Sequence, residues 1–313
     1  MSSIFFDWSG KIDQPTINAL SALKKEADAL SIPFFVVGAT ARDLILKQGY
    51  GIEPSRLTRD IDLGIKVAGW EQFDRLTDAL IATGRFASTR ERQRFRFDNL
   101  LIDIVPFGAI GDERQRISWP PEHAIFMSVA GFDEAYEFSI TARLNSDPEL
   151  DIRLPTLPGL ALLKIISWAD RYPERSKDAE DLVLIMQQYD QAGNLERLYD
   201  REQNLLEEEA FDTRLAGIRL LGRDMAMIAV PDTAAAVTEI LDAETKPASP
   251  YRLIIDMIRG LPMRDEKFEE IRFQVAKLKQ GFFEAAKRVR GETDPPGDHH
   301  GPGGGNQGLS SVF

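Results

Sequence analysis

The chain has 313 residues and contains no cysteine. This length is enough to bury a core without covalent staples, and the lack of cysteine excludes disulfides, a cysteine nucleophile and thiolate zinc sites. Thirty-eight Lys and Arg against fifty Asp and Glu give a net charge of −12, so bulk electrostatics does not draw the chain to nucleic acid or anionic lipid. Neither a membrane-spanning apolar run nor a signal-peptide pattern is found, so we expect a cytoplasmic protein without a membrane partner.

The first half of the chain alternates helical and strand patterns. Pro15 begins a segment with apolar residues at helical spacing, and a short buried strand follows over residues 32–37. The later elements are expected as helices at residues 39–47 and 70–80, as strands at 61–67, 93–97 and 100–105, and as a hairpin at 124–140. This alternation predicts an α+β fold in which helices flank a mixed sheet.

From Leu157 onward only helical spacing remains, and it ends in a long amphipathic segment over residues 266–290. A stretch with two prolines, residues 145–156, separates the two patterns and is interpreted as the boundary between them. We therefore predict a core of residues 1–150, an α-helical C-terminal domain of residues 151–290, and a disordered tail of residues 291–313 that is rich in Gly and Pro.

Two aspartates stand out in the strand that begins near residue 61. Asp60 and Asp62 are two residues apart, so both side chains point to one face of the strand while Ile61 and Leu63 anchor the other. Like charges at this spacing repel unless a cation lies between them. Paired carboxylates suit Mg²⁺, a hard ion that also accepts phosphate and water oxygens. A solvated edge strand is the alternative explanation.

Two neighbouring segments add to this pattern. Residues 36–43 read as a strand, a tight turn and a helix start, with small residues that let a phosphate approach free backbone N–H groups. Thr40 adds a hydroxyl to that turn. Asp103 is a single carboxylate in an otherwise apolar strand, where it is costly unless it is paired or bound to a metal. On a strand beside Asp60 and Asp62 it would supply a third ligand.

These features together resemble the DNA polymerase β-type nucleotidyltransferase superfamily over residues 33–107, although Ala39 stands where that family usually has a second Gly or a Ser. The resemblance implies a polymerase β-like core that transfers a nucleotide from an NTP. It implies that Mg²⁺ (or Mn²⁺) is held by Asp60, Asp62 and Asp103, which would be catalytic. The residues implied near the phosphates are Gly38, Ala39, Thr40 and Arg42.

The second half carries a further pattern. Lys164 and Arg171 are seven residues apart on one helix face, and Lys177-Asp178 with Asp181-Leu182 follow. This pattern resembles the AbiEii/AbiGii-type nucleotidyltransferase toxins. The resemblance implies catalytic roles for Lys164 and Asp178, phosphate contact by Lys164 and Arg171, the 3′ end of tRNA as acceptor, and a separately encoded antitoxin. A surface lattice of salt bridges is the structural alternative.

Other functions remain open from the sequence. The turn and acidic strand also resemble CCA-adding and poly(A) polymerases, and a small-molecule adenylyltransferase of the aminoglycoside-modifying kind is a further alternative. A catalytically silent NTP- or RNA-binding module is the alternative of another class. Four arginines among residues 90–96 offer a local basic surface for RNA or triphosphate in an otherwise acidic chain, or else a solvated strand face.

Overall fold

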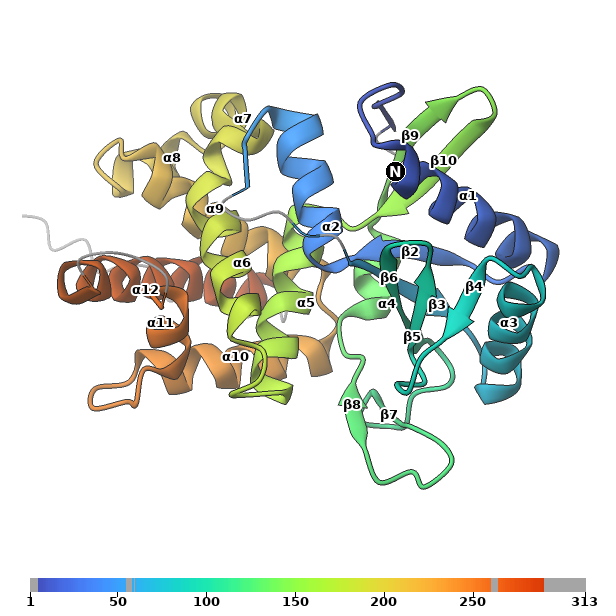
Figure 1. The fold of residues 1–313 in the computed structure, drawn as a ribbon. Helices are drawn as coiled ribbons and strands as arrows, with labels where there is room; N and C mark the ends of the chain where they lie inside the picture. The colour runs from blue at the N-terminus through green and yellow to red at the C-terminus, as the bar shows by residue number, and fades with distance from the viewer. Residues whose placement is uncertain (1–4, 55–57, 59, 260–263, 290–313) are drawn as a thin grey trace, which may run out of the picture.

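A five-stranded sheet forms the centre of the N-terminal half in this computed structural model, which describes residues 5–54, 58, 60–259 and 264–289 (Figure 1). The strand order is β2-β3-β6-β5-β4. These strands are β2 (Phe34–Val37), β3 (Ile61–Lys66), β4 (Phe86–Ser88), β5 (Arg94–Phe97) and β6 (Leu100–Phe107). The β3–β6 pair is parallel and the other pairs are antiparallel, so the predicted mixed sheet is confirmed.

Three helical segments accompany this sheet. α1 (Gln14–Ala29) and α3 (Trp70–Ala82) pack against each other beside it, and α2 (Gly38–Asp43) continues directly into η1 (Leu44–Gly49) (Figure 1). The start of α1 is fixed by Asp13, whose carboxylate accepts the Thr16 backbone N–H at 3.1 Å, and by Pro15 in the first turn. The helix and strand predictions for residues 15–107 are therefore confirmed, with ends that shift by a few residues.

The segment between residues 108 and 156 differs from the prediction in two places. The expected hairpin over residues 124–140 is wrong, because residues 132–137 form a helix, α4 (Phe132–Glu137), with Asp133 and Glu134 favouring its N-terminus. The strand before α4 pairs backward instead, in the hairpin of β7 (Arg116–Ser118) and β8 (Phe126–Ser128).

The second difference concerns the expected boundary. Asp147 and Pro148 form the turn of a hairpin in which β9 (Ile140–Ser146) and β10 (Glu149–Leu154) pair. β1 (Phe5–Asp7) adds to β9 in parallel and completes a three-stranded sheet. The change from strand to helix thus comes after Leu154, at the C-terminal end of the segment 145–156 that the sequence indicated as the boundary, although most of this segment is strand.

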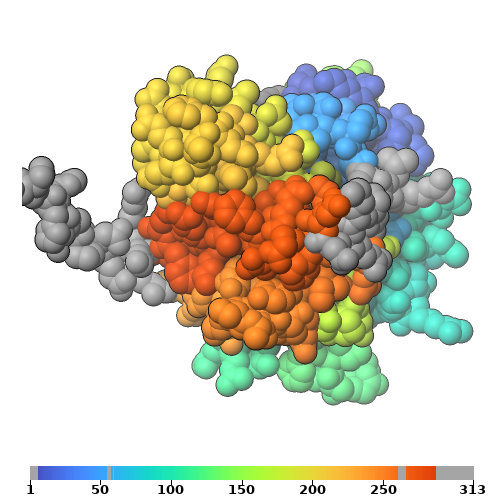
Figure 2. All heavy atoms as spheres, turned by 90° about the vertical axis from the view of Figure 1, so that its left-hand side faces the viewer, coloured from blue at the N-terminus to red at the C-terminus, as the bar shows by residue number. Residues whose placement is uncertain are grey.

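All elements that the structure describes after Leu154 are helical, as predicted. They are α5 (Leu157–Asp170), α6 (Ser176–Gln188), η2 (Asp190–Asn194), α7 (Leu195–Asp200), α8 (Gln203–Glu208), α9 (Thr213–Ile228), α10 (Pro231–Thr245), α11 (Arg252–Met257) and α12 (Arg264–Val289). Figure 2 shows α7–α8 and α10–α12 covering one side of the molecule. In the part of the chain that the structure describes, no helix is long and apolar enough to cross a membrane. The predicted tail lies outside the described residues.

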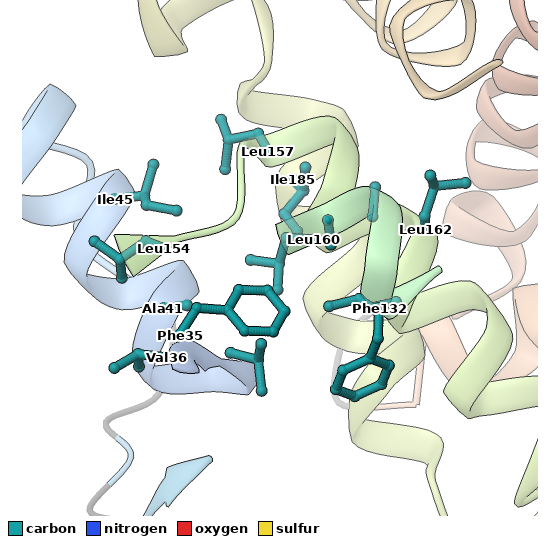
Figure 3. Packing of buried hydrophobic residues seen from close by; sticks show 14 of the residues in the cluster. Phe35, Val36, Ala41, Ile45, Phe132, Leu154, Leu157, Leu160, Leu162 and Ile185 are labelled. Carbon is teal, nitrogen blue, oxygen red and sulfur yellow. The ribbon is translucent and has the colours of Figure 1, made fainter. Parts of the chain in front are cut away.

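An apolar interface joins the sheet to the helical half. Phe35 of β2 and Ala41 of α2 face Leu160 of α5, and Ile185 of α6 lies behind it (Figure 3). All four side chains are fully buried. Burial of this apolar surface fixes α2 and the end of β2 against α5 and α6. This contact brings charged groups from both halves to one place.

Candidate active site

Two central strands place the aspartates together. In the parallel β3–β6 pair Asp62 lies directly opposite Asp103, and in the antiparallel β5–β6 pair Arg94 lies opposite Asp103. The three side chains therefore form a row across one face of the sheet, because directly opposite residues point the same way. Asp60 lies just before β3 and is exposed. The prediction that the carboxylates come from adjoining strands is confirmed.

The glycine corner lies against this row. Val37 pairs with Asp62 across β2 and β3, and Gly38 follows with a φ of +68°. A Cβ at position 38 would lie 2.7 Å from Asp62 Cγ, so only glycine lets the backbone come this close. Thr40 donates its hydroxyl to the Asp60 carbonyl oxygen at 2.6 Å and ties the start of α2 to the start of β3. Ala39 is buried in the same turn.

We expect Gly38→Ala to destabilise the fold by roughly 1–3 kcal/mol and to abolish most activity, because it adds backbone strain and displaces the Asp62 carboxylate. Gly84→Ala is a matched control, since Gly84 has a φ of +73° but open space around its Cα. Urea unfolding and initial rates of nucleotidyl transfer measure both effects. Equal activity of the two variants would show that the contact with Asp62 is unimportant.

Asp62 is the carboxyl of the site whose pKa is raised. Burial raises the pKa of its carboxyl from 3.8 to about 6, with Asp103 and Asp178 adding to the rise while Lys164 and Arg175 oppose it. Since the pKa in the folded state exceeds the ordinary value, ionisation of Asp62 opposes folding above about pH 6. The ionised form of such a buried carboxylate is stabilised by any cation that binds to it.

The stability of Asp62→Asn should therefore depend on pH. Asn carries no charge, so we expect this variant to exceed the unchanged protein in unfolding free energy by on the order of 1–3 kcal/mol at pH 7–8. The advantage should shrink through the window from pH 6 to about pH 4, as Asp62 takes up its proton in the folded state. Chemical denaturation at several pH values measures this, and a constant difference between the two proteins would contradict the raised pKa.

Asp103 is already bound by a cation from its own sheet. Arg94 donates Nε to Oδ1 at 2.8 Å and Nη2 to Oδ2 at 2.7 Å, a bidentate pair that also raises the pKa of the guanidinium. Within residues 5–54, 58, 60–259 and 264–289, no three His, Cys, Asp or Glu side chains are arranged to hold a metal. Asp60, Asp62 and Asp103 are thus neighbours, but they do not form the metal-ready trio that the sequence suggested.

A buried charge network meets the site from the helical half. Lys164 of α5 lies 2.7 Å from Asp178 Oδ1 and 2.7 Å from Asp181 Oδ2, both on α6. All three side chains are buried, so this is no surface lattice of salt bridges. Although burial lowers it, the pKa of Lys164 is raised overall by the two carboxylates. Asp178 Oδ2 is buried and has no hydrogen-bond partner among the described residues.

Arg42 belongs to this network. Its side chain is 1% exposed, and its guanidinium pairs with Asp181 of α6 and with Asp43. It therefore lacks the open face that a phosphate contact requires, and the prediction that Arg42 binds phosphate is corrected: the residue joins α2 to α6. Arg171, at the end of α5, pairs with Glu174 at 3.6 Å.

A cavity of about 70 Å³ is lined by residues from both the sheet and the helical half of the chain. Its polar lining comprises Gly38, Asp62, Lys164, Arg175 and Asp178, together with Ser128 and Ser167. The sequence analysis identified Gly38, Asp62, Lys164 and Asp178 as site residues. It missed Arg175, which lies in a turn, and the two serines, which belong to no recognised motif. Arg42 and Arg171 do not line this cavity. The cavity thus combines a glycine corner, an acidic strand and a buried lysine.

A mixed sheet with carboxylates on adjoining central strands, beside a glycine corner and a lysine, defines a nucleotidyltransferase. The family described as "Nucleotidyl transferase AbiEii toxin, Type IV TA system" matches residues 21–273, which is most of the chain. This chain belongs to the AbiEii nucleotidyltransferase toxin family, and the resemblance noted from Lys164, Asp178 and Asp181 is confirmed.

The solved structures that match this chain share little sequence identity with it. The solution structure of the antibiotic-resistance factor ANT(2'')-Ia is 13% identical with a TM-score of 0.33, covering 64% of this chain and 98% of that chain. A CCA-adding enzyme in complex with ATP is 17% identical with a TM-score of 0.30, covering 90% and 71%. The Thermotoga maritima CCA-adding enzyme is 15% identical with a TM-score of 0.30, covering 90% and 71%. The comparison with curated proteins gave no match.

Proposed function

We propose that this protein transfers a nucleoside monophosphate from an NTP to the 3′ hydroxyl of tRNA with cleavage of the α–β phosphate bond and release of pyrophosphate, and that it acts in the cytoplasm as the toxin of a toxin–antitoxin pair. The observation that supports the reaction is the contact between Gly38 and Asp62 inside a cavity that also holds Lys164 and Asp178. Membership of the AbiEii family supports the toxin role and a separately encoded antitoxin.

The residues present fit a divalent cation. Among the described residues, Asp60 and Asp62 make no direct ion pair, and Asp178 Oδ2 lacks a hydrogen-bond donor. Carboxylate oxygens without protein donors are the ligands that Mg²⁺ and Mn²⁺ prefer. Asp60 and Asp62 would hold the ion, which would polarise the α-phosphate and lower the pKa of the attacking hydroxyl. Asp103 would join them only when Arg94 releases it.

Backbone and side-chain groups of the protein would bind the phosphates, accept the proton and neutralise charge. The turn at Gly38 and Thr40 gives phosphate oxygens a close approach to backbone N–H groups. Lys164 binds Oδ1 of Asp178, while Oδ2 has no hydrogen-bond partner among the described residues and Asp178 lines the cavity, so we assign Asp178 as acceptor of the proton from the attacking hydroxyl. Arg94 neutralises Asp103 and thereby limits the repulsion on Asp62.

The test is a transfer assay with Mg²⁺, each α-labelled NTP in turn, and total tRNA. We expect label to enter tRNA and to be removed by digestion from its 3′ end. Transfer of label to tRNA that lacks a free 3′ hydroxyl, or to no RNA at all, would refute the proposed acceptor. Omission of the divalent ion should abolish the signal.

A second candidate acceptor is a polycationic small molecule. A cavity of about 460 Å³ adjoins the catalytic cavity and shares Ser128, Ala130 and Ile166 with it. Four carboxylates and one arginine line it, namely Glu113, Asp170, Asp232, Glu239 and Arg114. An acidic lining repels RNA phosphate and attracts amines. Transfer of label to an aminoglycoside, with none to tRNA, would favour this candidate.

A further inference from the structure

The basic side chains around the site are not equally available to bind a negatively charged substrate. Lys164 is balanced by Asp178 and Asp181, and Arg94 donates Nε and Nη2 to Asp103 and pairs through Nη1 with Glu91. An NTP brings several negative charges, and cations that already have carboxylate partners contribute little to its binding. Of the two cations that line the catalytic cavity, Lys164 and Arg175, only Arg175 lacks an ion pair among the described residues.

Arg175 is well placed for a substrate contact. It is the N-cap residue of α6, and its carbonyl oxygen accepts the Asp178 backbone N–H at 2.9 Å, so its backbone is fixed next to the proposed proton acceptor. Its side chain is exposed and lines the cavity together with Gly38 and Asp62. Its positive charge lowers the pKa of Asp62, which lines the same cavity. The residue thus contributes to the cavity from the helical half of the chain.

We propose that Arg175 binds the β- and γ-phosphates of the NTP and closes the phosphate site from the helical half. This inference rests on the proposed nucleotidyl transfer. A guanidinium has five donors in a planar fork that matches two phosphate oxygens, and it stays charged at any physiological pH. In this arrangement Lys164 keeps Asp178 and Asp181 in place, and Arg175 makes the contact that the sequence assigned to Lys164, Arg42 and Arg171.

The test compares Arg175→Gln with Lys177→Gln. Both changes remove one positive charge from exposed side chains two residues apart, but Lys177 does not line the cavity. Calorimetry with ATP and Mg²⁺ should show a dissociation constant about ten- to a hundredfold higher for Arg175→Gln. Lys177→Gln should stay within about twofold. Arg175→Lys should recover part of the loss, and binding of adenosine, which has no phosphate, should be unchanged in every variant.

Each outcome has a separate meaning. Equal ATP binding by Arg175→Gln and the unchanged protein would overturn this inference and leave the proposed function intact. An equal loss in Lys177→Gln would also overturn it, because the effect would then be one of general charge. A loss confined to tRNA binding would assign Arg175 to an acceptor phosphate instead. Failure of the unchanged protein to bind any NTP would refute the proposed function and this inference together.

Discussion

Asp62→Asn is expected to lower the rate of nucleotidyl transfer by at least about a hundredfold, with the fold intact. The change removes one negative charge at the point where the glycine corner, the cavity and the adjoining carboxylate meet. Electrostatic groups aimed at a reacting centre contribute on the order of 10²–10³ in rate when they are removed singly. Single-turnover assays with a labelled NTP would separate this loss from any change in substrate release.

Asp98→Asn is the matched control for this experiment. Asp98 lies in the exposed turn between β5 and β6 with a φ of +52°, a conformation that Asn also adopts readily. The same chemical change there should leave the transfer rate within about twofold. If Asp62→Asn retained most of its activity, the carboxylate row would not be the reaction centre, whatever the family of the chain.

Asp181→Ala is expected to destabilise the protein by roughly 3–5 kcal/mol, since it removes one carboxylate from a buried network and leaves its cations under-neutralised. Asp181 is fully buried and pairs with Lys164 of α5 and Arg42 of α2. Urea unfolding measures the effect. Because Asp62 and Asp178 remain, any loss of activity at low temperature should be smaller than that of Asp62→Asn.

The exposed pair of Lys24 and Asp28 provides the comparison. Its Nζ and Oδ2 atoms are 2.8 Å apart on the surface of α1, and such pairs contribute about 0–1 kcal/mol. Asp28→Ala should therefore change the free energy of unfolding by less than about 1 kcal/mol. An equally small effect of Asp181→Ala would mean that water or rearrangement compensates the buried cations, and that the network does not join the two halves.

Much of the fold follows from local pattern. The alternation of residues 61–67 and the apolar run at residues 32–37 identify strands because their side chains face a core on one or both sides. The hairpin expected at residues 124–140 failed because a short apolar segment fits strand or helix equally well. The turn at Gly131 and the acidic residues after it favour the start of the helix α4.

The candidate site was predictable where chemistry follows a spacing. Asp60, Asp62 and Asp103 were found because acidic residues in apolar strands are unusual and costly. The partner of each charge was not predictable, because it depends on register and tertiary contact: Arg94 lies opposite Asp103 through the β5–β6 pairing, and Arg42 meets Asp181 across a sequence separation of 139 residues. Arg175 is one basic residue among many in a turn, so only the cavity distinguishes it.

The place of the carboxylates in the sheet has a consequence for hydrogen exchange. β3 and β6 each have a neighbour on both sides, whereas residues 171–175 form an exposed turn between α5 and α6. Amides of the inner strands should therefore exchange only on global unfolding, and those of the turn through local opening. The carboxylates of β3 and β6 would then stay rigid during turnover. The turn on the helical side would open locally to admit and release the nucleotide.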